Sequence, residues 1–544
     1  MAMATEMRLS SILRALCGLV AVMTAGAPAL AKNRTEISPY IEVGQVLIAE
    51  LDDGGELLTY SMIAAGVDAS VQNRRAQAQI SYRYERRIDY RKDVGDSDVH
   101  SGLARAEVKI VPNLLNVEAG AIATRARTDI RGAAPLLGAG RIDNVSQVYA
   151  VYAGPTLTTR AGALDVTAAY RLGYTKVEQS APVFLPAGQE RLDFYDDSVS
   201  QFATASVGMA PGATGLPFGW GVSGAWERED AGQLDQRYDG KFVRADVTLP
   251  VSRTLALVGG VGYEDIEISQ RDAVRDLNGV PIVDNDGRFV TDKSSPRLLA
   301  YDTDGLIWDA GILWKPSRRT QLEARVGKRY GSTTYIGSFS HQLSPASAIR
   351  ISVYDGIQSF GRLLGDNVAR LPTSFQPPRN PLTEGFGGCV FGDAGAGGCL
   401  NDAFQSISTA NFRARGINAV YSASRGPLSL GAGIGYARRA YVAPRIAGFF
   451  SVDGVRDESY SAEGYVGYAI DSVSSVDGNV YLNHFDSGIA GAPSVTAAGV
   501  TGSYYRTFLP RLTGSLSAGL YSSDVEGFDS SLTAAGLAGL RYDF

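Results

Sequence analysis

The sequence predicts an all-β protein that crosses a membrane as a closed, antiparallel, transmembrane β-barrel. Three observations lead to this prediction. Apolar residues alternate with small or polar ones, nearly all alternating runs have nine or more residues, and tight turns alternate with long connections. Alternation gives each strand one apolar side. Runs of this length match a tilted membrane-spanning strand, and short periplasmic turns with long extracellular loops are typical of outer-membrane barrels.

Counting the alternating runs gives about 22 strands, and we allow 20 to 24. The run at residues 164–175, for example, has an apolar set from Leu164 to Tyr174 and a small, polar or charged set between. The expected strands begin near Ile41, Leu57, Ala76, Val99, Leu115, Val145, Leu164, Val199, Trp220, Lys241, Leu255, Leu306, Thr320, Thr334, Ala348, Arg413, Leu428, Ser459, Val476, Val495, Leu512 and Ser531.

Composition excludes other classes of protein. The 544 residues are 45% hydrophobic, which excludes disorder, and beyond the N-terminus no apolar run is long enough for a spanning helix. The formal net charge is -6 without a basic cluster, so no nucleic-acid partner is expected.

The N-terminus predicts export. Arg8 and Arg14 flank the start of an uncharged run, 15–31, which ends in Ala29-Leu30-Ala31 before Lys32. We interpret residues 1–31 as a cleaved signal peptide, the alternative being a buried N-terminal helix. Residues 32–544 are then the barrel, located in the outer membrane of a Gram-negative cell. Alternation resumes within about ten residues of the cleavage site, which leaves no room for an N-terminal plug domain.

The longest connection, residues 355–411, contains the two cysteines that remain after cleavage, Cys389 and Cys399. In an oxidising compartment these two are expected to form a disulfide. Short helices are expected at 361–370 and 400–407. Loops of this length are usually functional. We hypothesise that the connection folds over or into the lumen, and the alternative is a surface loop exposed to the exterior.

Charged residues of both signs occupy positions that should face the inside of the barrel, because such groups are costly against lipid. Two interpretations remain open: a ladder of charges that braces the wall, or the lining of a polar conduit. The candidate residues are Arg83, Glu85, Arg105, Glu107, Arg171, Arg244, Asp246, Glu323, Arg325 and Arg350.

Catalytic chemistry finds little support. The three histidines, His100, His341 and His484, have no spacing that suggests a triad, and none lies near the cysteines, so neither an enzyme nor a metal site is expected. Residues 431–435 read Gly-Ala-Gly-Ile-Gly but lie inside a strand pattern, where a nucleotide loop does not belong. We expect these glycines to permit strand curvature, and we expect no cofactor.

Two resemblances add to this interpretation. Leu540, Tyr542 and Phe544 at the C-terminus resemble the signal that the barrel-assembly machinery reads, which implies that machinery as a partner. Residues 313–320, 326–331 and 344–345, with the opening 38–43 and 82–87, resemble the putative β-barrel porin family and the exosortase- and exopolysaccharide-associated outer-membrane barrels of alphaproteobacteria. The resemblance covers about a hundred residues and implies an outer-membrane location and a link to surface polysaccharide.

The sequence therefore predicts an outer-membrane, porin-like channel for polar solutes, linked to surface polysaccharide by the resemblance. The alternative is a non-conducting structural or surface-interaction barrel. The expected partners are outer-membrane lipid, lipopolysaccharide, the barrel-assembly machinery and polysaccharide.

Overall fold

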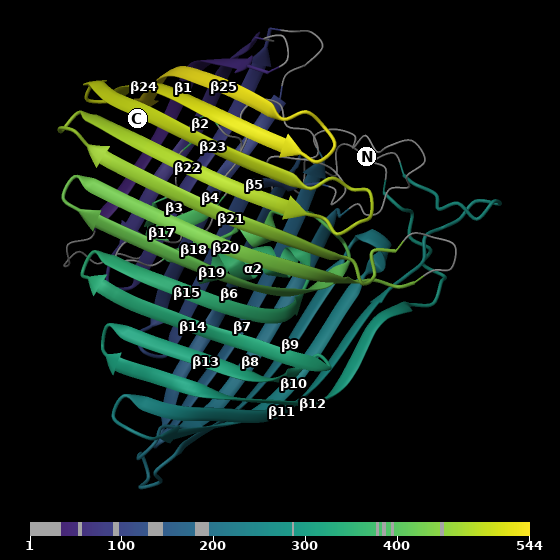
Figure 1. Cartoon of the computed structure of the whole chain (residues 1–544). Helices are drawn as coiled ribbons and strands as arrows, with labels where there is room; N and C mark the ends of the chain where they lie inside the picture. Colours follow the sequence, from purple (N-terminus) through teal and green to yellow (C-terminus); the bar gives the residue numbers. More distant parts are fainter. Residues whose placement is uncertain are drawn as a thin grey trace.

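A computed structural model describes residues 34–52, 57–90, 97–128, 145–179, 195–284, 288–376, 380–382, 388–392, 397–445 and 451–544. The predicted signal peptide, residues 1–31, lies outside these ranges. Within them the chain forms one ring of 22 antiparallel strands (Figure 1), as the alternation predicted. The strands of the ring are β1 (Arg34–Glu50), β2 (Leu57–Gln72), β3 (Ala76–Asp89), β4 (Ser97–Val111), β5 (Leu115–Arg127), β6 (Val145–Ala161), β7 (Leu164–Gln179), β8 (Asp197–Met209), β9 (Gly219–Ala231), β10 (Arg237–Pro250), β11 (Leu255–Gln270), β12 (Leu298–Ser317), β13 (Thr320–Arg329), β14 (Ser332–Ser344), β15 (Ser347–Gln358), β19 (Asn411–Arg425), β20 (Leu428–Val442), β21 (Arg456–Ala469), β22 (Ser474–Asp486), β23 (Val495–Leu509), β24 (Leu512–Val525) and β25 (Ser531–Asp543).

The ring closes between its first and last strands. β1 pairs with β25 from Tyr40 opposite Asp543 to Glu50 opposite Thr533, and every other strand pairs with its neighbours along the chain. A closed ring leaves no strand edge in the hydrocarbon layer, where an unpaired backbone group would have no partner.

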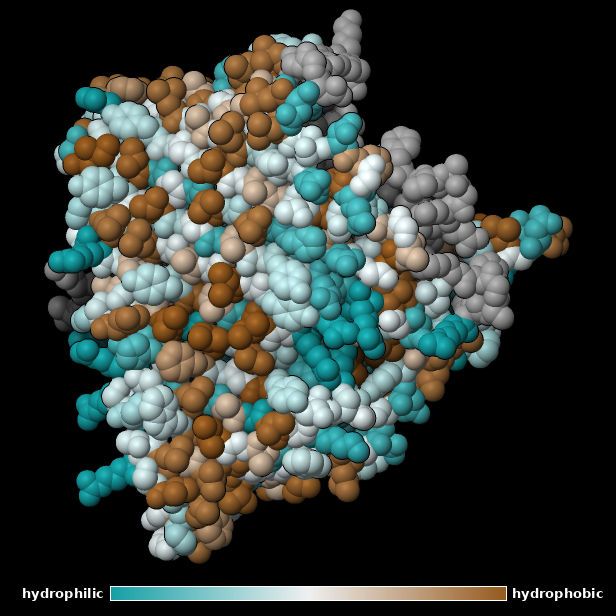
Figure 2. Space-filling model, viewed as in Figure 1, coloured by the Kyte–Doolittle hydropathy of each residue, from teal (hydrophilic) through white to brown (hydrophobic). Residues whose placement is uncertain are grey.

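The two faces of each strand differ in the way that a membrane barrel requires. On β1, Val43 and Leu47 on the outer face are 50% and 48% exposed, whereas Val46 and Ile48 on the inner face are 1% and 5% exposed. Figure 2 shows apolar side chains spread over the outer face of the front strands, and hydrophilic ones gathered toward the right-hand ends of those strands.

The connections follow the predicted alternation with two exceptions. β8 and β9 are joined on the turn side by nine residues, 210–218, more than the five residues, 232–236, that join β9 and β10 on the loop side. β13 and β14 are joined on the loop side by Tyr330 and Gly331 alone, with φ values of 53° and 68°. Two successive positive φ angles are typical of a two-residue hairpin turn. The alternation of short and long connections is therefore not strict. The β13–β14 hairpin stops short of the loop-side end of β12, since Lys328 pairs with Trp308 and β12 begins at Leu298.

Candidate functional site

The connection between β15 and β19 lies inside the barrel. It contains the helix α2 (Phe360–Arg370), a small sheet of β16 (Phe375–Gln376), β17 (Cys389–Gly392) and β18 (Gly397–Cys399), and the 3-10 turn η3 (Asn401–Ala403). Figure 1 shows α2, β17 and β18 among the strands of the ring, and their residues contact strands from several sides of it. We call residues 359–410 the inserted segment. The alternative of an exposed surface loop is wrong, because most of the segment's described residues are buried.

The helix α2 packs against β5, β6, β7 and β8. It begins at Ser359, whose side chain accepts a hydrogen bond of 3.2 Å from the backbone N–H of Arg362, an ordinary N-cap. Leu363, Leu364 and Val368 are at most 4% exposed, and they belong to one apolar cluster with Ile122 and other inward side chains of the wall. The predicted helix at 361–370 is therefore present, and its apolar face is turned to the wall.

Three arginines hold the helix by charge. Arg362 donates to Glu227 Oε2 at 2.8 Å, and its guanidinium lies 3.6 Å from the centre of the Tyr238 ring. The wall residue Arg105 donates to the carbonyl of Ala369 at 2.9 Å and to that of Leu371 at 3.1 Å, so it satisfies the helix C-terminus. The third contact joins Arg171 to Asp366 at 3.0 Å. Arg105 and Arg171, both predicted to face inward, thus contact the inserted segment.

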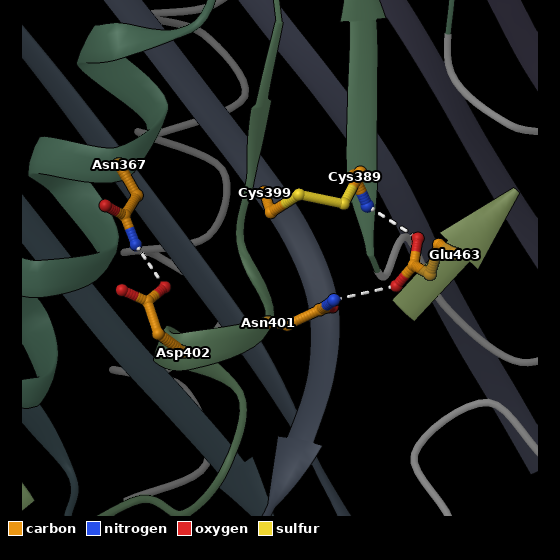
Figure 3. The surroundings of a disulfide bond; sticks show 6 residues. All are labelled: Asn367, Cys389, Cys399, Asn401, Asp402 and Glu463. Atoms are coloured by element: carbon orange, nitrogen blue, oxygen red, sulfur yellow. Dashed lines mark hydrogen bonds between the residues drawn. A yellow bond between two sulfur atoms is a disulfide. The ribbon is translucent and has the colours of Figure 1, made fainter. Parts of the chain in front are cut away.

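The disulfide sheet rests on the opposite part of the wall (Figure 3). Cys389 and Cys399 face each other across β17 and β18 and are joined by a disulfide. Glu463 of β21 accepts two hydrogen bonds from the segment, one of 2.7 Å from the backbone N–H of Cys389 and one of 2.8 Å from Asn401 Nδ2. One wall carboxylate therefore holds both the sheet and the turn that follows it.

Two glycines of β20 make room for this sheet. A Cβ atom at Gly433 would lie 2.2 Å from the Cys389 sulfur, and one at Gly431 would lie 2.6 Å from the Phe391 ring. The Gly-Ala-Gly-Ile-Gly run, which we expected to serve strand curvature, allows the inserted segment to approach the wall closely. The glycine run and the two cysteines can each be recognised in the sequence, but only the folded chain shows that they are in contact.

A third contact completes the attachment. Leu382 is 1% exposed in an apolar cluster with Val46 and Tyr60 and with inward residues of β22–β25, and Asn380 Nδ2 donates to Thr501 Oγ1 at 2.9 Å. Beside this contact lies a cavity of about 440 Å³, which is lined by Pro381 of the inserted segment and by Arg83, Glu85 and other polar residues of the wall. The segment is thus attached at several places around the ring, with a polar cavity beside it.

The remaining candidate charges are mostly paired with each other. Arg244 and Arg325 share Asp246, at 2.7 and 2.9 Å, and Arg325 also contacts Glu323 at 2.7 Å. Arg83 contacts Glu85 at 3.1 Å and also Glu42. Glu107 lies opposite Glu118 in the ladder, and Arg350 is exposed. This pairing is the arrangement expected of a bracing ladder.

The end of the inserted segment differs from the prediction. Residues 400–407 were expected to form a helix, but only the turn η3 is present. The chain is irregular after it, and the backbone of Phe404 and Ile407 bonds to Arg127 at the end of β5, with N···O distances of 3.1 and 2.8 Å. Pairing with a strand edge replaces helical hydrogen bonds there.

Burial raises the pKa of the Asp402 carboxyl in η3, although Asn367 Nδ2 donates a hydrogen bond of 2.8 Å to this carboxyl.

The other sequence candidates have simpler surroundings. Leu540, Tyr542 and Phe544 are 47%, 39% and 60% exposed on the outer face, beside the seam between β25 and β1. His100, His341 and His484 each hydrogen-bond to a tyrosine or threonine hydroxyl. Among the described residues, no cluster of acidic, histidine or cysteine side chains is arranged to hold a metal ion. Nor does that part of the chain contain a helix long and apolar enough to span a membrane.

Comparison with known proteins gives matches of structure only. No protein-family model and no curated protein matches the chain. Solved structures with a similar barrel include the FrpB iron transporter of Neisseria meningitidis (8% identity, TM-score 0.42, 93% of this chain and 81% of that one). They also include the ferric-catecholate import receptor Fiu of E. coli (9%, 0.44, 93% and 81%) and BauA, the ferric preacinetobactin receptor of Acinetobacter baumannii (11%, 0.42, 94% and 81%). The chain is an outer-membrane β-barrel, as its closed ring of 22 strands and its apolar outer face show.

These findings correct the functional prediction. The three similar structures are named as an iron transporter, a ferric-catecholate import receptor and a ferric preacinetobactin receptor, not as porins. The prediction of a porin-like channel for polar solutes is not supported, because residues 359–410 fill part of the lumen of this barrel. Membership of the putative porin family is not supported either, since no family model matches. The long connection, which we hypothesised to fold over or into the lumen, fills part of it.

Proposed function

We propose that this protein is an outer-membrane transporter that is closed at rest by its own inserted segment and opens when that segment moves. The observation that carries the proposal is the attachment of residues 359–410 to the inner wall at several separate places, by apolar burial, by ion pairs and by Glu463. A passive channel has no use for so extensive a closure.

The proposal includes how the protein reaches its place. The signal peptide at residues 1–31 directs export, and the barrel-assembly machinery reads Leu540, Tyr542 and Phe544 on the exposed outer face of β25. Outer-membrane lipid and lipopolysaccharide surround the outer face. We propose no catalytic activity.

Conductance in planar bilayers tests the closure. We expect the purified wild-type protein to be silent, and a variant in which a short Gly-Ser linker replaces residues 360–409 to give large, steady steps. A matched control removes residues 272–296, the long connection between β11 and β12 outside the wall, and should stay silent. Equal conductance of wild-type protein and the 360–409 deletion would contradict the proposal.

A further inference from the structure

One boundary in the ring is only partly paired. β14 and β15 pair from Gly337 opposite Val353 to Ser344 opposite Ser347, and beyond Gly337 the ladder stops. Residues 332–336 of β14 therefore pair only with β13, and residues 354–358 of β15 pair only with β19. The Thr334 hydroxyl is buried in this gap without a hydrogen-bond partner among the described residues.

Side chains bridge the gap where the ladder is missing. Asp355 of β15 accepts two hydrogen bonds of 2.7 Å from Arg413 of β19. Arg415, also of β19, reaches across β15 and donates to the carbonyl of Thr333 at 3.0 Å and to the hydroxyl of Ser332 at 3.0 Å. Asp355, Arg413 and Arg415 share the register of Val353 and Ile417. The side chains of Asp355 and Arg413 are only 2% and 15% exposed, and Arg413 lies 5.0 Å from the centre of the Tyr330 ring, so these two fill the gap in the wall. Arg415 is 39% exposed on the outer register.

The bridge carries an excess of positive charge. Lys328 pairs with Thr333 in the ladder, so it lies beside the carbonyl that Arg415 contacts, and no carboxylate of the described residues forms an ion pair with it. Arg438 of β20 is directly opposite Arg415, and its own partner is Glu458 at 3.4 Å. Like charges directly opposite each other are unfavourable in a ladder unless an anion lies between them.

An apolar groove begins directly below these charges. It has a volume of about 590 Å³, in the range of ligand pockets, and is lined by outer-register side chains of β12–β15 that include Ile312, Val326, Tyr335, Phe339 and Val353. Tyr335 follows Thr333 on the same face of β14, so the groove and the cationic cluster are continuous. Arg413 and Arg415 share the single carboxylate of Asp355, at 2.7 and 3.1 Å, so the cluster keeps an excess of positive charge to which Lys328 adds. An apolar groove beside such an excess is complementary to an acyl chain with an anionic head.

We propose that this surface is a specific binding site for a phosphorylated lipid of the outer leaflet. One acyl chain lies in the groove of β12–β15, and the phosphate binds Lys328 and Arg415. Lys328 and Arg415 lie close to the two ends of the inserted segment, since β15 directly precedes that segment and β19 directly follows it. The site differs from the general lipid contact of a barrel in having one location and one head group.

Lipid retention measured by native mass spectrometry tests this site. The full-length protein is purified from nanodiscs of phosphatidylcholine with and without lipid A. We expect wild-type protein to keep lipid A, and the variant Lys328→Gln/Arg415→Gln to keep it about tenfold less, the loss that one charge-assisted contact typically brings. The control Lys176→Gln/Lys241→Gln removes two outer-face lysines of β7 and β10 and should retain lipid A like the wild type.

A second pair of variants tests the groove without changing charge. Val326→Trp fills it and should displace lipid A, whereas Val243→Trp, at a lipid-facing residue of β10 that is 54% exposed, should not. The site is refuted if all variants retain lipid A equally. Equal losses in the lysine control and in Lys328→Gln/Arg415→Gln also refute it, because they would indicate attraction to surface charge in general.

Discussion

At the residue scale, Gly433 is the point where the wall admits the disulfide sheet. Gly433→Val places carbon atoms where the Cys389 and Cys399 sulfurs lie, 2.2 and 2.8 Å from the position of a Cβ atom. We expect overpacking to cost about 1–3 kcal/mol and to lower the melting temperature. The control is Gly502→Val on β23, where no atom lies within 4 Å of an added Cβ. A Gly433→Val protein that melts like Gly502→Val would contradict the close approach.

Also at this scale, Asp402 makes the attachment of the inserted segment depend on pH. Burial raises the pKa of this carboxyl in the folded state, so the folded state favours the protonated form. The resulting stability is fully present below the unfolded-state pKa of about 3.9 and is lost as pH rises through the higher folded-state pKa. Asp402→Asn should therefore raise the melting temperature at pH 7 and flatten its dependence on pH. As a comparison, Asp366→Asn removes the ion pair with Arg171 and should lower the melting temperature at pH 7.

At the element scale, α2 depends on Arg362. The side chain of Arg362 is 7% exposed and lies between Glu227, Glu229 and Tyr238. Arg362→Gln leaves buried carboxylates without their cation, a loss of about 3–5 kcal/mol, so we expect α2 to separate from the wall. Limited proteolysis should then cut within residues 360–370. Arg370→Gln, at an exposed position of the same helix, should remain as resistant as wild type, and equal resistance of both variants would contradict this account.

The partly paired boundary between β14 and β15 predicts uneven hydrogen exchange. Amides without a hydrogen-bond partner in the ladder exchange through small local fluctuations, whereas paired amides exchange only when a larger part of the structure unfolds. Residues 332–336 should exchange faster than residues 338–342 of the same strand, measured by mass spectrometry in nanodiscs. Uniform protection along β14 would show that the ladder continues to its end.

The elements of the ring could be predicted because each depends on a local pattern. Strands β2, β3, β5 and β11, for example, begin at the predicted residue, since period-two alternation and adjacent turns define them. The site could not be predicted in the same way. Glu463 lies 74 residues from Cys389, and Asn380 lies 121 residues from Thr501. Nothing local marks a carboxylate or a glycine as part of a contact that only ring closure creates.

For the whole molecule, attachment at separate parts of the ring means that no single contact closes the lumen. Cys389→Ser/Cys399→Ser removes a disulfide typically worth about 2–4 kcal/mol, so the melting temperature should fall. The barrel should nevertheless stay silent in bilayers, because α2, Asn380 and Leu382 still hold the inserted segment. Adding Arg362→Gln to this double variant releases a second attachment, and we expect conductance to appear. Arg370→Gln in the same background is the control and should remain silent. Large steps from the double serine variant alone would mean that the disulfide sheet, rather than the distributed attachment, keeps this barrel closed.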